Sequence, residues 1–369
     1  MPRPTIYYVV EPAEALPIWF SRVIDGMRKT CMKNRYLLQE LDDVSVLDTL
    51  DSLPHALMVI CSQNNWTQHI VSELRARHVM PLLLGVIPTD FGHDVSGIMR
   101  AQRNFVEKMM DYFSGCGRRH MALVGVNHNA SNDNVKAEAF LTNARSMGLP
   151  TSAKDVYWID EDITNCVIQC LENSSCYDSV ICSNDYVAAI LLAEARTRGV
   201  RIPEDLYLAG LGDTLIGRYT QPTLTTTSND EFYDMGCQAV NMWKLLMDNP
   251  NLSNMTITVS TEITPRGSTA FAEPGKYDRA APTQDSPSIT IGAGSQAIRN
   301  LENCLRACDA LDTQILHMVL QGQSNEQIEN GLFLAHSSLH YRLRKLYQLA
   351  NVSSRTELET LFKYYLPNF

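Results

Sequence analysis

Short apolar runs alternate with helix-like segments as far as Leu211, and this alternation limits the fold more than any other feature of the chain. Runs of five or six apolar residues between helices are typical of parallel strands that are buried on both faces. The sequence therefore predicts an α/β architecture with doubly wound parallel sheets, which bind ligands at the carboxyl ends of their strands. The predicted strands are Thr5–Val10, Tyr36–Leu38, Ala56–Cys61, Met80–Val86, Met121–Val126, Val156–Ile159, Ser179–Ser183 and Leu206–Leu211.

The length of the chain and its termini bound the class of protein. A chain of 369 residues suits two or three domains. The first residues, MPRPTIYYVVEPAE, contain no basic segment followed by an apolar run, and no stretch reaches the roughly 18 apolar residues that span a membrane. We therefore expect a cytoplasmic protein. Its 10 cysteines are scattered, a pattern that favours buried thiols over metal ligands or disulfides.

The most specific pattern in the first 270 residues lies between Ser179 and Asp230. Its pieces are SND at 183–185, GVRIPED at 199–205, AGLGD at 209–213 and PTLTT at 222–226. This segment resembles the effector-binding core of the lactose-repressor (LacI/GalR) family, and the resemblance extends over roughly Thr5–Phe271. It implies a periplasmic-binding-protein-like (type I) sensor of two α/β lobes, in which a small molecule held in the cleft alters lobe closure.

The resemblance also implies domain boundaries. Residues 1–270 are expected to form the sensor, with lobe 1 at about 5–116 and 231–247, and lobe 2 at about 117–228 and 255–270. Residues 271–310 are expected to form a linker and a linker helix. The first part is rich in Pro, Gly, Ser and Thr, which is typical of a flexible tether. The second part has apolar residues at helical spacing, so it predicts a helix that packs on the next domain or on a second copy.

Candidate ligand-binding residues follow from the same resemblance. The strand-end pair is retained as Asn184 and Asp185, the usual arginine falls on Lys136, and the residue on the last crossover is Asn229. The first of two paired acids is replaced by Gly212, which leaves Asp213 and removes an acceptor for paired hydroxyl groups.

Strand-end loops supply a second group of candidates. Aromatic side chains with amide and charged neighbours suit a sugar or another small polar metabolite. For each of these residues the alternative is packing within a lobe or a solvated loop. The group comprises Glu11, Trp19, Phe20, Gln63, Asn64, Trp66, Asn127, His128 and Asn129.

The sequence contains no nucleophile elbow, metal-ligating cluster or phosphate-binding glycine loop. We therefore expect no enzyme activity, no catalytic residue, no metal and no cofactor. The family that the sensor resembles carries a DNA-binding helix-turn-helix before its lobes, whereas the first predicted strand here begins at Thr5. The expectation is that the DNA-binding unit has moved to the C-terminal part of the chain.

An amphipathic helix is predicted at Ser337–Gln348. Wound at about 100° per residue, it places its leucines on one stripe and its polar and basic residues on the other face. Such a helix is either a major-groove reader or an ordinary solvated helix. Capping boxes at Ser324 with Gln327 and at Ser354 with Glu357 predict helix starts on either side, and Gly322 predicts a helix end.

Residues 311–369 resemble the LuxR-type helix-turn-helix in one continuous register. The match rests on Gly322, Ser324-Asn325-Glu326, Ile328, Leu332, Leu334, Leu339, Leu343 and VSSRTEL at 352–358. It implies a small all-α domain that binds double-stranded DNA, with principal contacts at His340, Tyr341 and Arg344. Lys345 is expected to meet a phosphate, and Ala335 stands where the family has a Ser or Thr helix cap. The predicted DNA-binding residues are Ser337, Ser338, His340, Tyr341, Arg344 and Lys345.

The charge distribution limits how residues 311–369 bind DNA. The whole chain has a formal net charge of −10, whereas residues 311–369 carry five acids and five bases. Such a domain touches few phosphates per copy, so we expect it to act as a homodimer. The prediction is a one-component transcription regulator that senses a small polar effector. Two alternatives remain open: a small-molecule-binding protein with a protein-interaction tail, and a DNA-binding protein whose cleft senses nothing.

Overall fold

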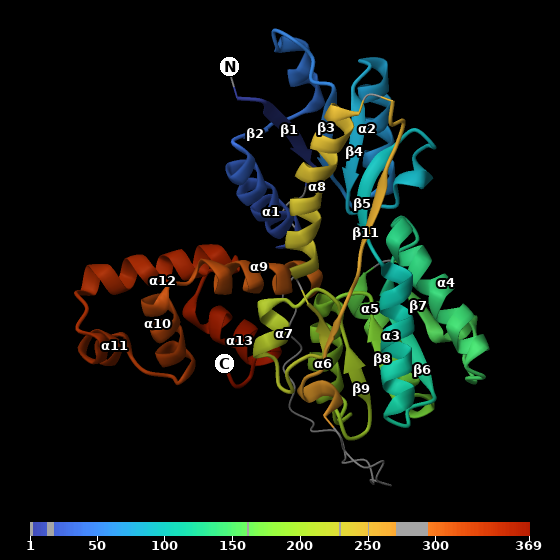
Figure 1. Cartoon of the computed structure of the whole chain (residues 1–369). Helices are drawn as coiled ribbons and strands as arrows, with labels where there is room; N and C mark the ends of the chain where they lie inside the picture. Colours follow the sequence, from blue (N-terminus) through green and yellow to red (C-terminus); the bar gives the residue numbers. More distant parts are fainter. Residues whose placement is uncertain (1–2, 13–17, 161, 229, 250, 271–293) are drawn as a thin grey trace. The chain divides into compact units, whose positions relative to one another are not determined.

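The computed structural model describes residues 3–12, 18–160, 162–228, 230–249, 251–270 and 294–369 (Figure 1). The chain divides into two compact units. Unit 1 comprises residues 1–108, 127–140 and 228–262, and unit 2 comprises residues 109–126, 141–227 and 263–369. Within the described ranges, no helix has the length and apolar character needed to cross a membrane.

Unit 1 contains a six-stranded sheet in the order β11-β5-β4-β3-β1-β2, and all its neighbouring strands are parallel. β3 is buried at all five residues, as the apolar runs predicted. β5 was not predicted, because its sequence SGIMR has only two large apolar side chains. The strands are β1 (Thr5–Val10), β2 (Leu37–Glu40), β3 (Ala56–Ile60), β4 (Met80–Leu84), β5 (Ser96–Arg100) and β11 (Thr256–Val259).

Two glycines bring α1 (Ile18–Asn34) and α8 (Asp230–Asp248) into close contact in unit 1 (Figure 1). A Cβ atom at Gly236 would lie 1.9 Å from the Val23 carbonyl oxygen, and one at Gly26 would lie 2.1 Å from the Tyr233 carbonyl oxygen. Only glycine therefore fits at this crossing. The other elements are α2 (Asn64–Ala76), η1 (Val44–Thr49) and η2 (Pro88–Asp90), while α3 (Gln102–Gly115) and α4 (Ser131–Ser146) run from residues of unit 1 into residues of unit 2.

The position of β11 corrects the predicted lobe boundaries. Residues 255–270 were assigned to lobe 2, but Thr256–Val259 pair in parallel with Gly97–Arg100 of β5 in unit 1. The assignment to the second unit holds only from Ile263 onward. The reason is that the backbone of β11 continues the parallel ladder of unit 1 beyond β5 and forms its edge strand.

Unit 2 contains a four-stranded parallel sheet in the order β7-β6-β8-β9 and a two-stranded antiparallel ladder of β10 with β12. The predicted bounds of β6 (Met121–Val126) are confirmed. The remaining strands are β7 (Val156–Trp158), β8 (Ser179–Cys182), β9 (Tyr207–Ala209), β10 (Thr226–Thr227) and β12 (Ile263–Thr264). The helices are α5 (Ile163–Glu172), α6 (Asp185–Thr197) and α7 (Leu215–Tyr219), with short 3-10 turns η3 (Ala153–Asp155), η4 (Ser174–Cys176) and η5 (Gly267–Thr269).

Five helices make up residues 294–369, which we call the tail: α9 (Gly294–Ala307), α10 (Ala310–Leu320), α11 (Asn325–Leu332), α12 (His336–Ala350) and α13 (Arg355–Tyr365). The predicted capping box at Ser324 and the helix end at Gly322 are confirmed. The box at Ser354 is half wrong. Ser354 accepts from the Glu357 N–H, but the Glu357 carboxylate bonds Ser353. Ala335 caps α12 without a side-chain bond, as expected.

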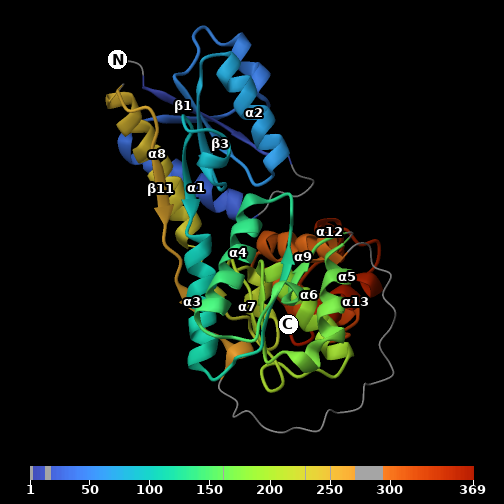
Figure 2. The same ribbon diagram turned by 90° about the vertical axis from the view of Figure 1, so that its right-hand side faces the viewer.

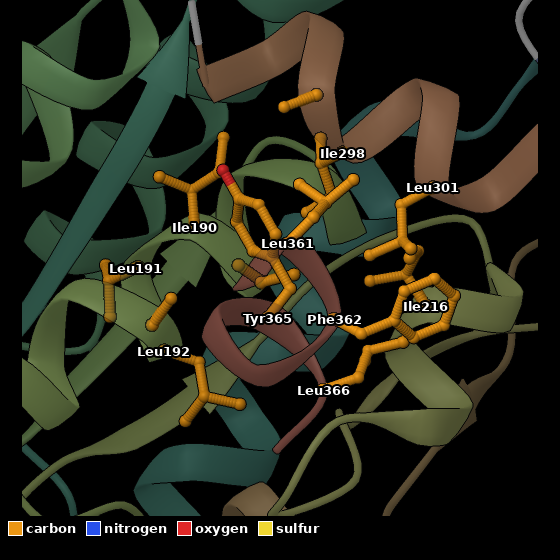
Figure 3. Close-up of a cluster of buried hydrophobic side chains, with 14 of the residues drawn as sticks. Ile190, Leu191, Leu192, Ile216, Ile298, Leu301, Leu361, Phe362, Tyr365 and Leu366 are labelled. Atoms are coloured by element: carbon orange, nitrogen blue, oxygen red, sulfur yellow. The ribbon is translucent and has the colours of Figure 1, made fainter. Parts of the chain in front are cut away.

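The tail is packed on the helices of unit 2 (Figure 2). One apolar cluster joins α6 to α7, α9, α13 and the residue that follows α13 (Figure 3). It includes Ile190, Leu191 and Leu192 of α6, Ile216 of α7, Ile298 and Leu301 of α9, Leu361, Phe362 and Tyr365 of α13, and Leu366. The linker helix was expected to pack on the next domain, and α9 does contact α12. α9 also packs against α6 and α7, a contact that the sequence did not predict. Residues 271–293 of the predicted tether lie outside the described residues.

Candidate functional site

The two aromatic ligand candidates of α1 have different surroundings. Phe20 is 0% exposed in the core of unit 1, so the prediction that it contacts a ligand is corrected. Trp19 is partly exposed and stacks on Phe232, with ring centroids 5.6 Å apart. Its indole ring also covers Gly85, where a Cβ atom would lie 2.2 Å from the ring. Trp19 is thus held as an aromatic surface with one stacked neighbour.

Glu11 has a structural role at the start of α2. It is buried, and its Oε2 accepts hydrogen bonds from Ser62 N (2.5 Å), Ser62 Oγ (3.0 Å) and Gln63 N (3.1 Å). These bonds fix the start of α2, where two predicted ligand residues lie. Gln63 is exposed at the N-terminal cap of α2, and Trp66 is half-buried within the helix.

A pocket of about 500 Å³ opens within unit 1 next to these residues. Of the predicted ligand residues it includes Asn64, but not Gln63, Trp66 or Asn127. Its amide and carboxyl groups around one aromatic ring suit a small molecule that carries hydroxyl groups. The lining residues are Asn64, Asn65, Gln68, Ile87, Asp90, Phe91, Ser131, Asn134, Val135 and Glu138.

Asp133 connects two further candidates at the start of α4. Its Oδ2 accepts a hydrogen bond from the Asn127 N–H (3.0 Å), and its Oδ1 accepts one from Lys136 Nζ (2.8 Å). Lys136 is only 5% exposed, so its ammonium group is held inside the protein by an ion pair. Asn127 Oδ1 accepts from the Asn129 N–H at 2.8 Å, which shapes the loop before α4.

The strand-end pair Asn184 and Asp185 is used to build unit 2. Asn184 Oδ1 caps α6 by accepting from the Tyr186 and Val187 N–H groups. Asp185 is 0% exposed and accepts from Thr226 Oγ1 (2.6 Å) and from Thr214 N (2.8 Å). The prediction that Asp185 contacts a ligand is therefore corrected, because its carboxylate joins α6 to the 213–214 loop and to β10.

The acid at Asp213 is likewise engaged within unit 2. It lies in the left-handed region with φ of 47°, and it forms ion pairs with Arg218 and Arg266. Burial opposes ionisation, but the hydrogen bonds from Arg218 and Arg266 outweigh it and lower the pKa of Asp213. An atom added at Gly212 would meet nothing within 4 Å, so the position of the missing acid is open. Asn229 lies outside the described residues.

Asp185 should give unit 2 a distinctive pH dependence. Burial raises the pKa of Asp185 to about 6, although hydrogen bonds from Thr226 and Thr214 act the other way. The folded pKa exceeds the unfolded value of about 3.9, so the protonated form of Asp185 stabilises the folded state. This contribution to the free energy of unfolding is fully present below about pH 4 and is lost as the pH rises through 6. We expect Asp185→Asn to remove a change of about 3 kcal/mol in the free energy of unfolding.

Thermal unfolding of the wild type and of Asp185→Asn between pH 4 and 8 measures this difference. Asp111→Asn, which alters an exposed acid of α3, is the matched control and should keep the wild-type profile. Parallel profiles for wild type and Asp185→Asn would show that the buried carboxyl does not titrate in this range.

The exposed face of α12 carries five of the six predicted DNA-binding residues. Ser337, Ser338, His340, Tyr341 and Arg344 are exposed, and Tyr341 reaches 73% exposure. The opposite face is buried through Leu339, Leu343, Leu346 and Ala350, the stripe that the periodicity predicted. The helix thus presents hydroxyl, aromatic, imidazole and guanidinium groups outward from a packed support.

Lys345 was predicted to contact a phosphate, but its ammonium group is bonded within the tail. Its Nζ donates to Asp312 Oδ2 (2.7 Å) and to the Ala307 carbonyl oxygen (3.1 Å). Arg342 Nη1 binds Asp312 Oδ1 (2.6 Å) and also Asp309. Two of the three bases of α12 therefore neutralise acids at the start of α10. Burial opposes ionisation of Asp312, but the bonds from Lys345 and Arg342 prevail and lower its pKa.

The sequence did not predict two exposed residues, one in the turn before α12 and one in its first turn. Phe333 is 95% exposed in the turn before α12 and adopts a left-handed φ of 53°. His336 lies with its ring centroid 4.2 Å from that of His340, and its Nδ1 is 2.8 Å from Glu329 Oε1. The i, i+4 spacing of the two histidines was the available signal, whereas no sequence feature marked Phe333 as exposed.

Comparisons with known proteins agree with the predicted α/β fold. Residues 110–269 match the family model of the periplasmic binding protein-like domain, which ends before α9. The chain is 22% identical over 245 residues to the HTH-type transcriptional repressor PurR of Haemophilus influenzae, covering 61% of this chain and 68% of that protein. It is 24% identical over 155 residues to the HTH-type transcriptional regulator GalR of Escherichia coli, covering 41% and 45%.

Solved structures give the same result. The transcription regulator CcpA of Lactococcus lactis aligns with a TM-score of 0.62 at 19% identity, covering 72% of this chain and 100% of that one. A complex of the transcriptional regulator CelR with cellobiose aligns with a TM-score of 0.61 at 14% identity, covering 72% and 85%. The predicted periplasmic-binding-protein-like α/β fold is therefore confirmed, and the relatives are transcription regulators.

Proposed function

We propose that this chain is a one-component transcription regulator of the cytoplasm, in which the α/β sensor binds a small polar effector and the tail binds double-stranded DNA. The observation that carries the proposal is the exposed face of α12. Arg344 and Tyr341 project from a helix whose other face is buried, and a three-residue turn joins this helix to α11. A helix held in this way can enter the major groove, as in a helix-turn-helix of LuxR type.

The charges of the tail favour binding by two copies. Asp309 and Asp312 hold Arg342 and Lys345, so Arg344 is the base of α12 that remains exposed. Each phosphate contact contributes to affinity through counterion release, and one copy offers few of them. We therefore propose a homodimer, in which two α12 helices read two half-sites.

We propose that the α/β part binds a small polar effector, such as a sugar or a related metabolite. Relatives of this fold were solved with cellobiose and with ribose. In unit 1, Trp19 offers an aromatic face, and the amide groups of Asn64 and Gln68 line the pocket. These groups provide the stacking and hydrogen bonding that hydroxylated ligands require.

Selection from a random-sequence duplex library tests DNA binding by the full chain. We expect enrichment of one palindromic or repeated motif, and an affinity for the enriched duplex that falls steeply with salt concentration. Recovery of no motif, together with salt-independent retention of any duplex, would favour the alternative in which the tail binds another protein.

A second candidate function keeps DNA binding but has a cleft that senses nothing. It is favoured by Asp185 and Asp213, whose carboxylates are occupied by partners within unit 2. A thermal-shift screen of sugars, nucleosides and amino-acid-derived metabolites separates the two, because a specific ligand raises the unfolding temperature.

A further inference from the structure

A buried carboxylate of the tail binds the backbone of unit 2 at the short helix α7. Glu302 of α9 is 0% exposed. Its Oε1 accepts a hydrogen bond from the Leu215 N–H (2.9 Å), and its Oε2 accepts one from the Ile216 N–H (2.7 Å). The first N–H groups of a helix have no partner within the helix, so an acceptor from elsewhere must satisfy them. Here that acceptor comes from 86 residues along the chain.

The same turn of α7 is tied to the loop that holds Asp213. Thr214 caps α7 by accepting from the Gly217 N–H (3.1 Å), and its own N–H donates to Asp185 at 2.8 Å. Arg218 of α7 pairs with Asp213. The two N–H groups that donate to Glu302 therefore follow directly on the 213–214 loop and are tied to it by these bonds.

On its other side α9 is joined to α12. Cys304 Sγ lies 3.8 Å from the Leu346 carbonyl oxygen, and Lys345 Nζ donates to the Ala307 carbonyl oxygen at 3.1 Å. Leu301 and Ile298 of α9 are fully buried in the cluster that α6 and α13 share (Figure 3). A displacement of α9 consequently reaches the helix that carries Arg344.

We propose that Glu302 is a coupling residue, which fixes the first turn of α7 to α9 and so makes the position of α12 depend on the 213–214 loop. Arg306 of α9 also pairs with this carboxylate, with Nε 3.2 Å from Oε1. Burying a carboxylate costs free energy unless hydrogen bonds satisfy both oxygens. The bonds from Leu215 and Ile216 therefore favour one arrangement of α7 against α9. Burial raises the pKa of Glu302, although the bonds from the Ile216 and Leu215 N–H groups and from Arg306 act the other way. The role of α12 in DNA binding rests on the proposed function, whereas the coupling between α7, α9 and α12 does not.

Hydrogen exchange measured by mass spectrometry on the full chain tests the coupling without DNA or effector. In Glu302→Gln we expect residues 211–220 to exchange about 10-fold faster, because one of two buried N–H groups loses its acceptor. Residues 294–310 and 336–350 should also exchange faster, while residues 56–76 of unit 1 stay unchanged. Glu172→Gln, an exposed acid at the end of α5, is the matched control and should change none of these segments.

A double-mutant comparison tests the direction of the coupling. Asp213→Asn removes the charge that holds Arg218 and should speed exchange in residues 336–350 of the otherwise wild-type chain. In the Glu302→Gln background, the same change should have no further effect there. The proposal is overturned if Glu302→Gln leaves residues 336–350 unchanged, or if Asp213→Asn acts equally in both backgrounds. Failure of DNA selection would refute the proposed function but would leave these exchange rates as they are.

Discussion

Replacing Arg344 and Tyr341 together with alanine should abolish sequence-specific DNA binding while the chain stays folded. Both side chains are exposed, so their removal leaves no cavity and no buried group without a partner. A bidentate contact of Arg with a base contributes about 1–3 kcal/mol, so the loss from Arg344 alone is on the order of 10- to 100-fold. Loss of the Tyr341 contact adds to it. Footprinting and binding titrations on a selected duplex measure the change.

Lys363→Ala is the matched control for this pair. It removes an exposed cation from α13 of the same helical unit, next to Glu359 at 3.7 Å. We expect a small, sequence-independent loss of affinity at most. A footprint that survives the double substitution would sink the assignment of α12, and an equal loss in Lys363→Ala would mean that the tail binds DNA only through its overall charge.

Asp312→Ala should unfold or loosen the helical tail. Asp312 is 0% exposed. Its Oδ1 accepts a hydrogen bond from Arg342 Nη1 (2.6 Å) and its Oδ2 accepts one from Lys345 Nζ (2.7 Å). It also completes the capping box of α10. Breaking a buried pair costs about 3–5 kcal/mol, and the partial exposure of both bases reduces this to about 2–4 kcal/mol. Thermal unfolding and hydrogen exchange in residues 310–350 measure the loss. DNA binding should fall with it.

Acid should have a similar effect on the wild type. The pKa of Asp312 is lowered, so its contribution is present above the unfolded value of about 4 and is lost as the pH falls below it. Asp309→Ala, which removes a more exposed partner of Arg342, should cause a smaller loss of stability. If Asp312→Ala unfolds at the same temperature as the wild type, the network does not hold α10 to α12.

Much of the fold could be predicted from the sequence because the main signals are local. The apolar runs Thr5–Val10 and Met121–Val126 became β1 and β6 with the predicted bounds. The caps at Ser324 and Gly322 were also local, since a helix end depends on its own neighbours. β5 and β11 lacked such signals, because their pairing depends on each other across about 160 residues of chain.

The candidate sites were less predictable. Polar residues at strand ends were identified, but whether a carboxylate serves a ligand or the fold depends on partners far along the chain. Asp185 is saturated by Thr214 and Thr226, and Asp213 by Arg218 and Arg266. Lys345 was expected to meet phosphate and instead meets Asp312. Charge and spacing alone do not distinguish these cases.

The sequence by itself determined the parallel α/β fold, the helical tail and the outward face of α12, because periodicity and capping act within a few residues. The tertiary structure alone decided which ion pairs the charged side chains form and how the tail packs against the rest of unit 2. In the sequence, Glu302 is an ordinary helical acid. The Ile216 N–H that donates a hydrogen bond to it lies 86 residues earlier in the chain. Only folding brings them together, since a buried carboxylate is stable where backbone donors satisfy it.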